Sequence, residues 1–169
     1  MPSKRIAIGA VTKAFELKSI VLEHLARQGH SVLDLGCFNA ETFVKYTSVG
    51  EAVAHALYAG DADFGVVLCN YGTSGSIGVA KFRGVCACNC ESVKTAEAAR
   101  KVNGANVLCM GASVVSPEEA CEIAEAFINA EFLDIPGVPQ KVQDFRRKAR
   151  EQLIAWGEIP QSRELQTLD

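Results

Sequence analysis

The sequence predicts a single α/β domain in which a parallel sheet lies between two layers of helices. Short apolar runs alternate along the chain with longer segments of helical periodicity, and this alternation occurs five times. One of the runs, Phe64–Leu68 (FGVVL), is apolar throughout, as in strands whose two faces are both covered. A repeated strand–helix order implies right-handed crossovers, which place helices on both faces of the sheet.

The first two strand–helix units are bounded by glycines. Arg5–Gly9 (RIAIG) is the first predicted strand, and it stops at a glycine. Lys13–Gln28 is the first predicted helix, because its apolar residues recur on one face and Gly29 follows as a C-cap. Ser31–Leu35 is the second strand, and Thr47–Ala59, again followed by a glycine, is the second helix.

The remaining units follow the same pattern. After the strand Phe64–Leu68, a turn rich in glycine and serine leads into a short helix that begins near Ser74. Val85–Cys88 is the fourth strand, followed by a helix over Ser92–Lys101, and Asn106–Met110 is the fifth strand. The last helix has a strong start in Ser116-Pro117-Glu118-Glu119, which combines a hydroxyl N-cap, a proline and a carboxylate three residues after the cap. It should run to about Asn129.

A break at Asp134–Pro139 (DIPGVP) ends the domain. We therefore expect an α/β domain over residues 1–134 and a helical extension over 135–169 that packs on the domain or on a neighbouring subunit. The apolar residues of this extension are Val142, Phe145, Leu153, Ile154 and Trp156. Its basic residues could supply a phosphate-binding cation across an interface or form a solvated helix face; they are Arg146, Arg147, Lys148 and Arg150.

The composition narrows the class of protein. The chain has 169 residues, of which 49% are hydrophobic, so it can bury a sizeable core and is not a disordered chain. Its 17 Lys and Arg against 20 Asp and Glu give a net charge of −3, which argues against a nucleic-acid partner. No apolar run reaches the ~18 residues of a membrane span, so we expect no membrane partner. Seven cysteines, an odd number, indicate reduced thiols and a cytoplasmic protein.

Together the five units predict a three-layer, Rossmann-like (flavodoxin-like) α/β/α domain with the strand order 2-1-3-4-5. In open sheets of this kind, ligands bind beyond the carboxyl ends of the strands, where the strand order reverses. The reversal would fall between the first and third strands. The loops Ala10–Ala14 and Cys69–Ser76 are then expected to face each other across the site.

The most informative segment is Cys69-Asn70-Tyr71-Gly72-Thr73-Ser74-Gly75-Ser76. It leaves a buried strand and enters a helix, so its backbone N–H groups and the helix dipole favour an anion such as a phosphate, a carboxylate or an enediolate. The same field would lower the pKa of the Cys69 thiol. The alternative interpretation is a small buried thiol followed by an ordinary glycine turn. The segment lacks P-loop spacing, so ATP is not implied.

Several separate motifs follow one another in a specific order between residue 4 and about residue 133. They are Ile6-Ala7-Ile8-Gly9, Phe15-Glu16-Leu17-Lys18, Gly29-His30, Asp61-Ala62-Asp63, the stretch from Cys69 through Gly72, Ser76 and Ile77 to Lys81, and Asn103 with Asn106-Val107-Leu108. Their order and spacing resemble the type B ribose-5-phosphate isomerases and the related galactose-6-phosphate isomerase subunits. The chain looks like a divergent member of that family.

The resemblance implies roles for single residues. Cys69 matches the base that moves a proton between C1 and C2 of an open-chain sugar phosphate, and the glycine loop after it matches the loop that holds the enediolate oxygens. Asn103 matches an asparagine that positions the substrate, and Tyr46 matches a loop tyrosine that could line the site or serve in packing. Members of the family are dimers or tetramers with sites shared between subunits, so we expect a homodimer or homotetramer.

The chain departs from the family's pattern at several positions. Val11-Thr12, followed by Lys13, stands where Asp-His is usual in the family. Val102 replaces a histidine implicated in opening the sugar ring, and valine cannot transfer protons. Lys13 could bind phosphate or be a solvated first-turn lysine. Tyr71 replaces a threonine, which suggests a smaller or differently shaped substrate, and its hydroxyl could donate to an oxyanion. A substrate that cannot cyclise, such as a tetrulose phosphate, needs no ring-opening acid.

The sequence thus predicts an aldose–ketose isomerase (an intramolecular oxidoreductase) that acts on a small phosphorylated sugar, of the ribose-5-phosphate type or shorter, through an enediolate. The candidate catalytic residues are Cys69, Tyr71 and Asn103. The candidate anion- or substrate-binding residues are Thr12, Lys13, Tyr46, Asn70, Gly72, Thr73, Ser74, Gly75 and Ser76.

The alternative is a non-catalytic sugar-phosphate-binding protein or the inactive subunit of a two-subunit isomerase. The loss of both histidines favours it, and the retention of Cys69 disfavours it. We expect no organic cofactor and no metal, because a base and an anion hole suffice for proton transfer beside a carbonyl. The spacing of Cys86, Cys88 and Cys90 is also unlike that of a tetrahedral zinc site.

Overall fold

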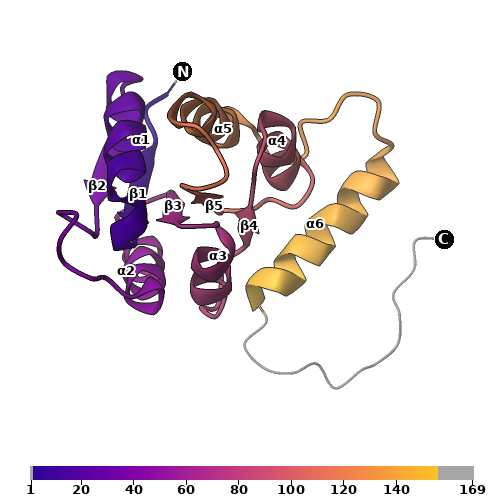
Figure 1. Cartoon of the computed structure of the whole chain (residues 1–169). Coiled ribbons are helices and arrows are strands. Elements are labelled where there is room, and N and C mark those ends of the chain that lie inside the picture. The colour runs from indigo at the N-terminus through magenta and orange to yellow at the C-terminus, as the bar shows by residue number, and fades with distance from the viewer. Residues whose placement is uncertain (1, 156–169) are drawn as a thin grey trace.

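The computed structural model describes residues 2–155 and contains a five-stranded parallel sheet flanked by helices (Figure 1). The strands are β1 (Arg5–Ala10), β2 (Ser31–Asp34), β3 (Phe64–Cys69), β4 (Ala87–Asn89) and β5 (Val107–Gly111). The helices are the short η1 (Thr12–Ala14), then α1 (Phe15–Arg27), α2 (Tyr46–Ala59), α3 (Thr73–Val79), α4 (Val93–Lys101), α5 (Pro117–Asn129) and α6 (Gln140–Ala155).

The strand order is β2-β1-β3-β5-β4, so the expected order 2-1-3-4-5 is wrong at one edge of the sheet. β5 lies between β3 and β4, and its Gly111 pairs with Cys69 at the end of β3. All residues of β5 are buried, whereas the three residues of β4 are only half-buried. A fully buried apolar strand fits the interior of a parallel sheet, and a short, partly exposed strand fits its edge. The order of the strands along the chain does not show which of β4 and β5 lies inside the sheet.

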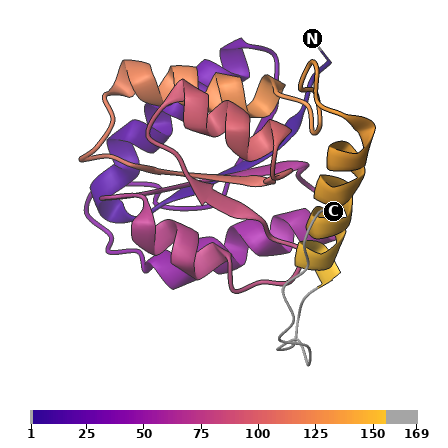
Figure 2. The same ribbon diagram turned by 90° about the vertical axis from the view of Figure 1, so that its right-hand side faces the viewer.

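The helices form two layers with the sheet between them, as the sequence predicts (Figure 2). On one face α1, α4 and α5 pack in the larger core, where Leu25 of α1 and Phe127 of α5 are completely buried. On the other face α2 and α3 form a smaller core around Val53 and Val79. Residues that alternate along each strand supply the two cores, as the pleat of a strand requires.

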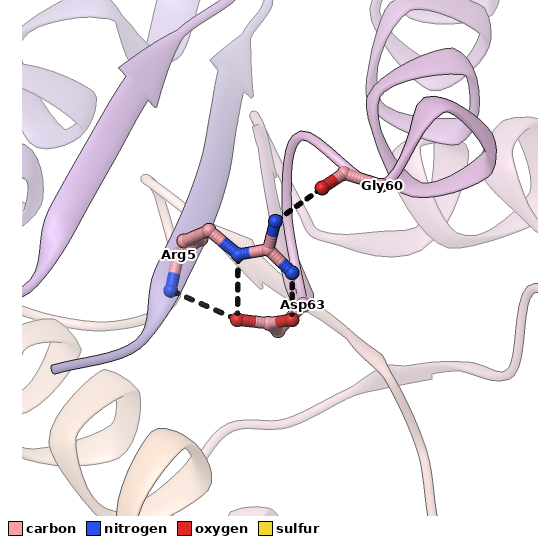
Figure 3. A network of polar contacts seen from close by, with 3 residues as sticks. All are labelled: Arg5, Gly60 and Asp63. Carbon is pink, nitrogen blue, oxygen red and sulfur yellow. Dashed lines mark hydrogen bonds and ion pairs between the residues drawn. The ribbon is translucent and has the colours of Figure 1, made fainter. Parts of the chain in front are cut away.

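Arg5, at the start of β1, makes a polar network at the end of the sheet where the parallel strands begin. Its Nη2 donates a hydrogen bond to Asp63 Oδ1 at 2.6 Å, and its Nε donates to Asp63 Oδ2 at 3.2 Å (Figure 3). Its Nη1 donates to the carbonyl of Gly60, the C-cap residue of α2. The hydrogen bond from Arg5 and its charge lower the pKa of Asp63. The Asp61-Ala62-Asp63 turn therefore has a structural role at the amino ends of the strands, whereas Cys69 lies at the carboxyl end of β3.

The C-terminal helix α6 follows a segment without helix between residues 130 and 139, where the sequence predicts a break. Figure 1 shows α6 beyond β4, at the end of the sheet opposite β2. Its Arg150 donates from Nε to the carbonyl of Gly104 at 2.9 Å and lies 5.5 Å from the ring centre of Phe132. No α6 residue is buried. The boundary at residue 134 and the packing on a neighbouring subunit stay predictions, and Trp156 lies outside the described residues.

None of the helices in residues 2–155 is both long and apolar enough to cross a membrane.

Candidate active site

The Cys69 thiol lies at the carboxyl end of β3, where the chain turns into α3. Gly72 makes this turn in the left-handed region, with φ at 78°, which glycine adopts without steric cost. Ser74 Oγ donates a hydrogen bond to Cys69 Sγ at 3.2 Å, and the backbone N–H groups of Tyr71, Gly72 and Gly75 also donate to this sulfur. Cys69 is only 1% exposed, so the thiol interacts with these protein groups rather than with solvent.

The donors around Cys69 change its acidity. Burial acts to raise the pKa of the Cys69 thiol, but the hydrogen bonds from Ser74 and from the three backbone N–H groups outweigh it, and the pKa lies below its ordinary value. Burial raises the pKa of the other cysteines for which a shift is resolved: Cys86, Cys88, Cys90 (to about 11), Cys109 and Cys121. The fold thus favours the thiolate at Cys69.

Cys88 lies in β4, and Cys86 and Cys90 flank that strand. No cluster of three or more His, Cys, Asp or Glu side chains in residues 2–155 could hold an ion.

Three residues outside the predicted set shape the loop after Cys69. Gly111 of β5 lies beneath it, and a Cβ atom there would come within 2.5 Å of the Tyr71 carbonyl carbon. Asn89, at the end of β4, packs against Gly72 so closely that a Cβ on Gly72 would lie 1.8 Å from Asn89 Oδ1. Ser113 Oγ donates to Asn70 Oδ1 at 2.8 Å. The only sequence signal for these contacts is the glycine that ends the fifth apolar run.

A cavity of about 370 Å³ opens beside this loop, at the point where the strand order reverses. Three segments line it: the loop after β1, the connection from β2 into α2, and the loop after β3. The lining residues are Val11, Thr12, Lys13, Phe43, Val44, Lys45, Tyr46, Thr47, Asn70 and Ser74. The expected meeting of the first and third loops is confirmed. Cys69 lies behind Ser74, which both lines the cavity and contacts the sulfur.

Thr12 connects two of the segments that line the cavity, the loop after β1 and the connection from β2 into α2. Its hydroxyl donates to the carbonyl of Thr42 at 2.7 Å and accepts from the backbone N–H of Val44 at 3.0 Å. The hydrogen of this hydroxyl is therefore engaged within the protein. In this arrangement Thr12, one of the predicted anion-binding residues, fastens the two loops to each other rather than presenting a donor to a ligand.

The other predicted residues divide into two groups. Lys13, Tyr46, Asn70 and Ser74 all line the cavity, and Gly72 and Gly75 are buried beside the thiol. By contrast, the Tyr71 side chain is 60% exposed and does not line the cavity. Thr73 is exposed, and its carbonyl accepts a hydrogen bond from Ser76 Oγ at 2.8 Å.

Asn103 lies away from Cys69 within this chain. It precedes β5, whereas Cys69 pairs with Gly111 at the opposite end of that strand. Asn103 lines a second cavity, of about 520 Å³, together with Arg83, Cys86 and Leu153 of α6. The amino ends of parallel strands lie at one end of the sheet and their carboxyl ends at the other. Asn103 and Cys69 are therefore at opposite ends, and one chain cannot bring both to the same ligand.

Lys45 is the charged lining residue of this cavity that the sequence does not predict. It immediately precedes α2, a helix with neither a side-chain cap nor an acidic residue in its first turn. An uncapped helix start presents free N–H groups and a partial positive charge. The connection that carries Lys45 has no motif of its own, so only its position beside Thr12 reveals it.

Several known proteins are similar to this chain. A protein-family model described as Ribose/Galactose Isomerase matches residues 6–143. The D-erythrulose-4-phosphate isomerase of Pectobacterium atrosepticum is 36% identical over 127 residues, which are 75% of this chain and 84% of that protein. The ribose-5-phosphate isomerase B of Escherichia coli is 34% identical over 129 residues, 76% of this chain and 86% of that protein.

Two further relatives extend the likeness. A 4-deoxy-4-sulfo-D-erythrose isomerase of a Clostridium species is 29% identical over 151 residues, which cover 89% of this chain and 94% of that protein. The crystal structure of a ribose 5-phosphate isomerase from Thermotoga maritima superposes with a TM-score of 0.77 at 31% identity, over 88% of this chain and 98% of that one.

Proposed function

The chain belongs to the ribose/galactose isomerase family, and we propose that it interconverts the aldose and ketose forms of a small open-chain sugar phosphate, with Cys69 as the base. The observation that carries this proposal is the Cys69 sulfur, which accepts a hydrogen bond from Ser74 Oγ at 3.2 Å and lies behind Ser74 in the wall of the 370 Å³ cavity, called the switch-point cavity below. The relatives, all named as isomerases of small sugar phosphates or of a sulfonated analogue, support the same class of reaction.

The reaction needs only proton transfers. The Cys69 thiolate takes the proton from C2 of the aldose, and the electron pair moves into the carbonyl to give an enediolate. The proton then returns from the thiol to C1, while a second proton moves from O2 to O1, and the ketose results without an oxidant or a reductant. Backbone N–H groups of the loop after Cys69 can stabilise the negative oxygen as it forms, and Ser74 stabilises the thiolate.

A four-carbon substrate suits this chain best. Val102 stands where the family that the sequence resembles has a histidine implicated in ring opening. A tetrose whose C4 oxygen carries a phosphate cannot close a furanose ring, so it requires no such acid. Two of the relatives named above act, by their names, on four-carbon sugars.

An assembly of two or more copies in the cytoplasm accounts for two other features. Asn103 could reach a substrate beside Cys69 only from a second copy of the chain, which fits a homodimer or homotetramer. All seven cysteines are free, which suits a reducing compartment.

The test is isomerisation in heavy water, with deuterium incorporation followed by NMR. We expect D-erythrose 4-phosphate and its ketose isomer to interconvert, with solvent deuterium entering at the carbon that receives the proton. Cys69→Ala should abolish turnover and exchange while it still binds the substrate, with Ser19→Ala on α1 as a matched control.

Several results would count against the proposal. Turnover of pentose or hexose phosphates at or above that of tetrose phosphates would exclude the four-carbon assignment. Full activity in Cys69→Ala would exclude this residue as the base. Binding of sugar phosphates by the wild-type protein, without turnover of any four- to six-carbon substrate, would favour the alternative of a binding protein or an inactive subunit.

A further inference from the structure

We propose that Lys13 and Lys45 together bind the phosphate group of the substrate at the mouth of the switch-point cavity. This inference deepens the proposed function and rests on it for the nature of the ligand. It assigns Lys45, which no sequence motif indicates, and it favours the phosphate-binding interpretation of Lys13 over that of a solvated lysine.

The first support is the hydrogen-bonded pairing of the two loops that carry these lysines. Thr12 Oγ1 accepts from the backbone N–H of Val44, and Lys13 and Lys45 are the residues that follow this pair in each loop. The same hydroxyl donates to the carbonyl of Thr42, so one side chain makes both hydrogen bonds of the pairing, one as acceptor and one as donor. The two lysines are thereby held on neighbouring segments at the rim of one cavity.

The second support is the charge of the cavity. Its ten lining residues include two lysines and no carboxylate. Neither ammonium group has an ion-pair partner among the residues that the structure describes, although the chain as a whole is acidic. Two lysines that line one concave surface, with no acid among its lining residues, favour a dianionic group such as phosphate over a neutral one.

The third support is the orientation that this site gives to the substrate. Asn70 and Ser74 form the part of the lining next to Cys69, whereas Lys13 and Lys45 come from the other two segments. A short sugar with its phosphate on the lysines can point its carbonyl end toward Ser74 and the thiol behind it. The negative phosphate is then paired with cations, which keeps it from disfavouring the thiolate.

The test is a binding experiment that does not depend on turnover. The probe is erythritol 4-phosphate, a four-carbon polyol phosphate without a carbonyl group, and its dissociation constant is measured by calorimetry. Lys13→Met and Lys45→Met should each weaken its binding by about tenfold, as the loss of a charge-assisted contact predicts. Lys45→Arg should retain most of the affinity. Lys94→Met, an exposed lysine on α4, is the matched control and should leave the affinity unchanged.

Unphosphorylated erythritol shows whether the lysines act on the phosphate itself. Both Met variants should bind erythritol as the wild type does, and the affinity for erythritol 4-phosphate should fall with rising salt in the wild type more steeply than in the variants. The proposal is overturned if either Met variant binds erythritol 4-phosphate within twofold of the wild type. It is also overturned if the wild type does not distinguish the phosphorylated from the free polyol.

These outcomes separate the lysine site from the proposed function. Loss of phosphate binding in both variants of a protein that shows no isomerisation would support the site and reject the isomerase. Isomerisation of tetrose phosphate with an unchanged KM in both variants would support the isomerase and reject the site.

Discussion

Replacing Ser74 by alanine should raise the pKa of the Cys69 thiol and slow catalysis at low pH. The substitution removes the donor whose Oγ lies 3.2 Å from Cys69 Sγ and leaves the three backbone N–H donors in place. A hydrogen bond to a charged group is worth about 1.5–3 kcal/mol, and water cannot readily replace it, because Cys69 is 1% exposed. At the lower end of this range, the thiolate population falls about tenfold at a pH where most of the thiol is protonated.

The effect of Ser74→Ala on kcat/KM depends on pH, because only the deprotonated thiol acts as a base. If the thiolate is the base, kcat/KM falls about tenfold in Ser74→Ala on the acid side of the profile and approaches the wild-type value once both thiols are ionised. Because the pKa of Cys69 is lowered in the folded protein, its ionisation stabilises the folded state at a pH above the pKa of an unfolded thiol. This stabilisation is lost as the pH falls through the pKa of Cys69 in the folded state. Ser74→Ala should therefore lose stability at alkaline pH rather than at acidic pH.

The assay is the ultraviolet absorbance of the thiolate as a function of pH, with Cys69→Ala as the blank. The thiol of Cys69 should ionise ahead of the five thiols whose pKa is raised by burial. Ser76→Ala is the matched control, because its hydroxyl lies in the same helix but donates to the Thr73 carbonyl. A Ser74→Ala titration that coincides with the wild type, or an equal shift in Ser76→Ala, would refute the role assigned to the Ser74 hydroxyl.

Two further predictions concern the support of the site and the core. Gly111→Ala should lower kcat/KM by about a hundredfold, because the added Cβ would lie 2.5 Å from the Tyr71 carbonyl carbon and would displace the loop after Cys69. Gly36→Ala is the control and should leave kcat/KM unchanged, because a Cβ there meets nothing within 4 Å. Arg100→Met should lower the free energy of unfolding in urea by about 1–3 kcal/mol, because the buried Ala105 carbonyl loses the donor that now lies at 2.7 Å. A stability equal to or above that of the wild type would mean that burying the guanidinium costs more than its hydrogen bond contributes.

Much of the candidate site could be predicted from the sequence because it depends on neighbours in the chain. The turn from Cys69 to Ser76 leaves a buried strand and enters a helix, and both properties are visible in its apolar run and its glycines. The capping box at Ser116 likewise confirms a local prediction, since its partner Glu119 is three residues away. The family resemblance also depends on short motifs of this kind, and the comparisons confirm it.

Other parts of the site could not be predicted because they depend on residues far apart in the chain. Lys45 becomes a candidate ligand only when Thr12, more than thirty positions earlier, accepts a hydrogen bond from Val44. Asn103 matches a family motif, yet its place before β5 sets it at the edge of the sheet opposite Cys69. The role of Gly111 depends on its contact with a loop that follows another strand.

Local sequence patterns were enough to predict the five strand–helix units, the break near residue 135 and the glycine turn that follows the Cys69 thiol. These follow from periodicity, caps and glycines, whose effects act over a few residues. Three features became visible only in the folded chain: β5 lies inside the sheet and β4 at its edge, the Ser74 hydroxyl meets the Cys69 sulfur, and three segments line one cavity. Burial and hydrogen bonding between distant segments decide these features, because each depends on which surfaces the whole chain covers.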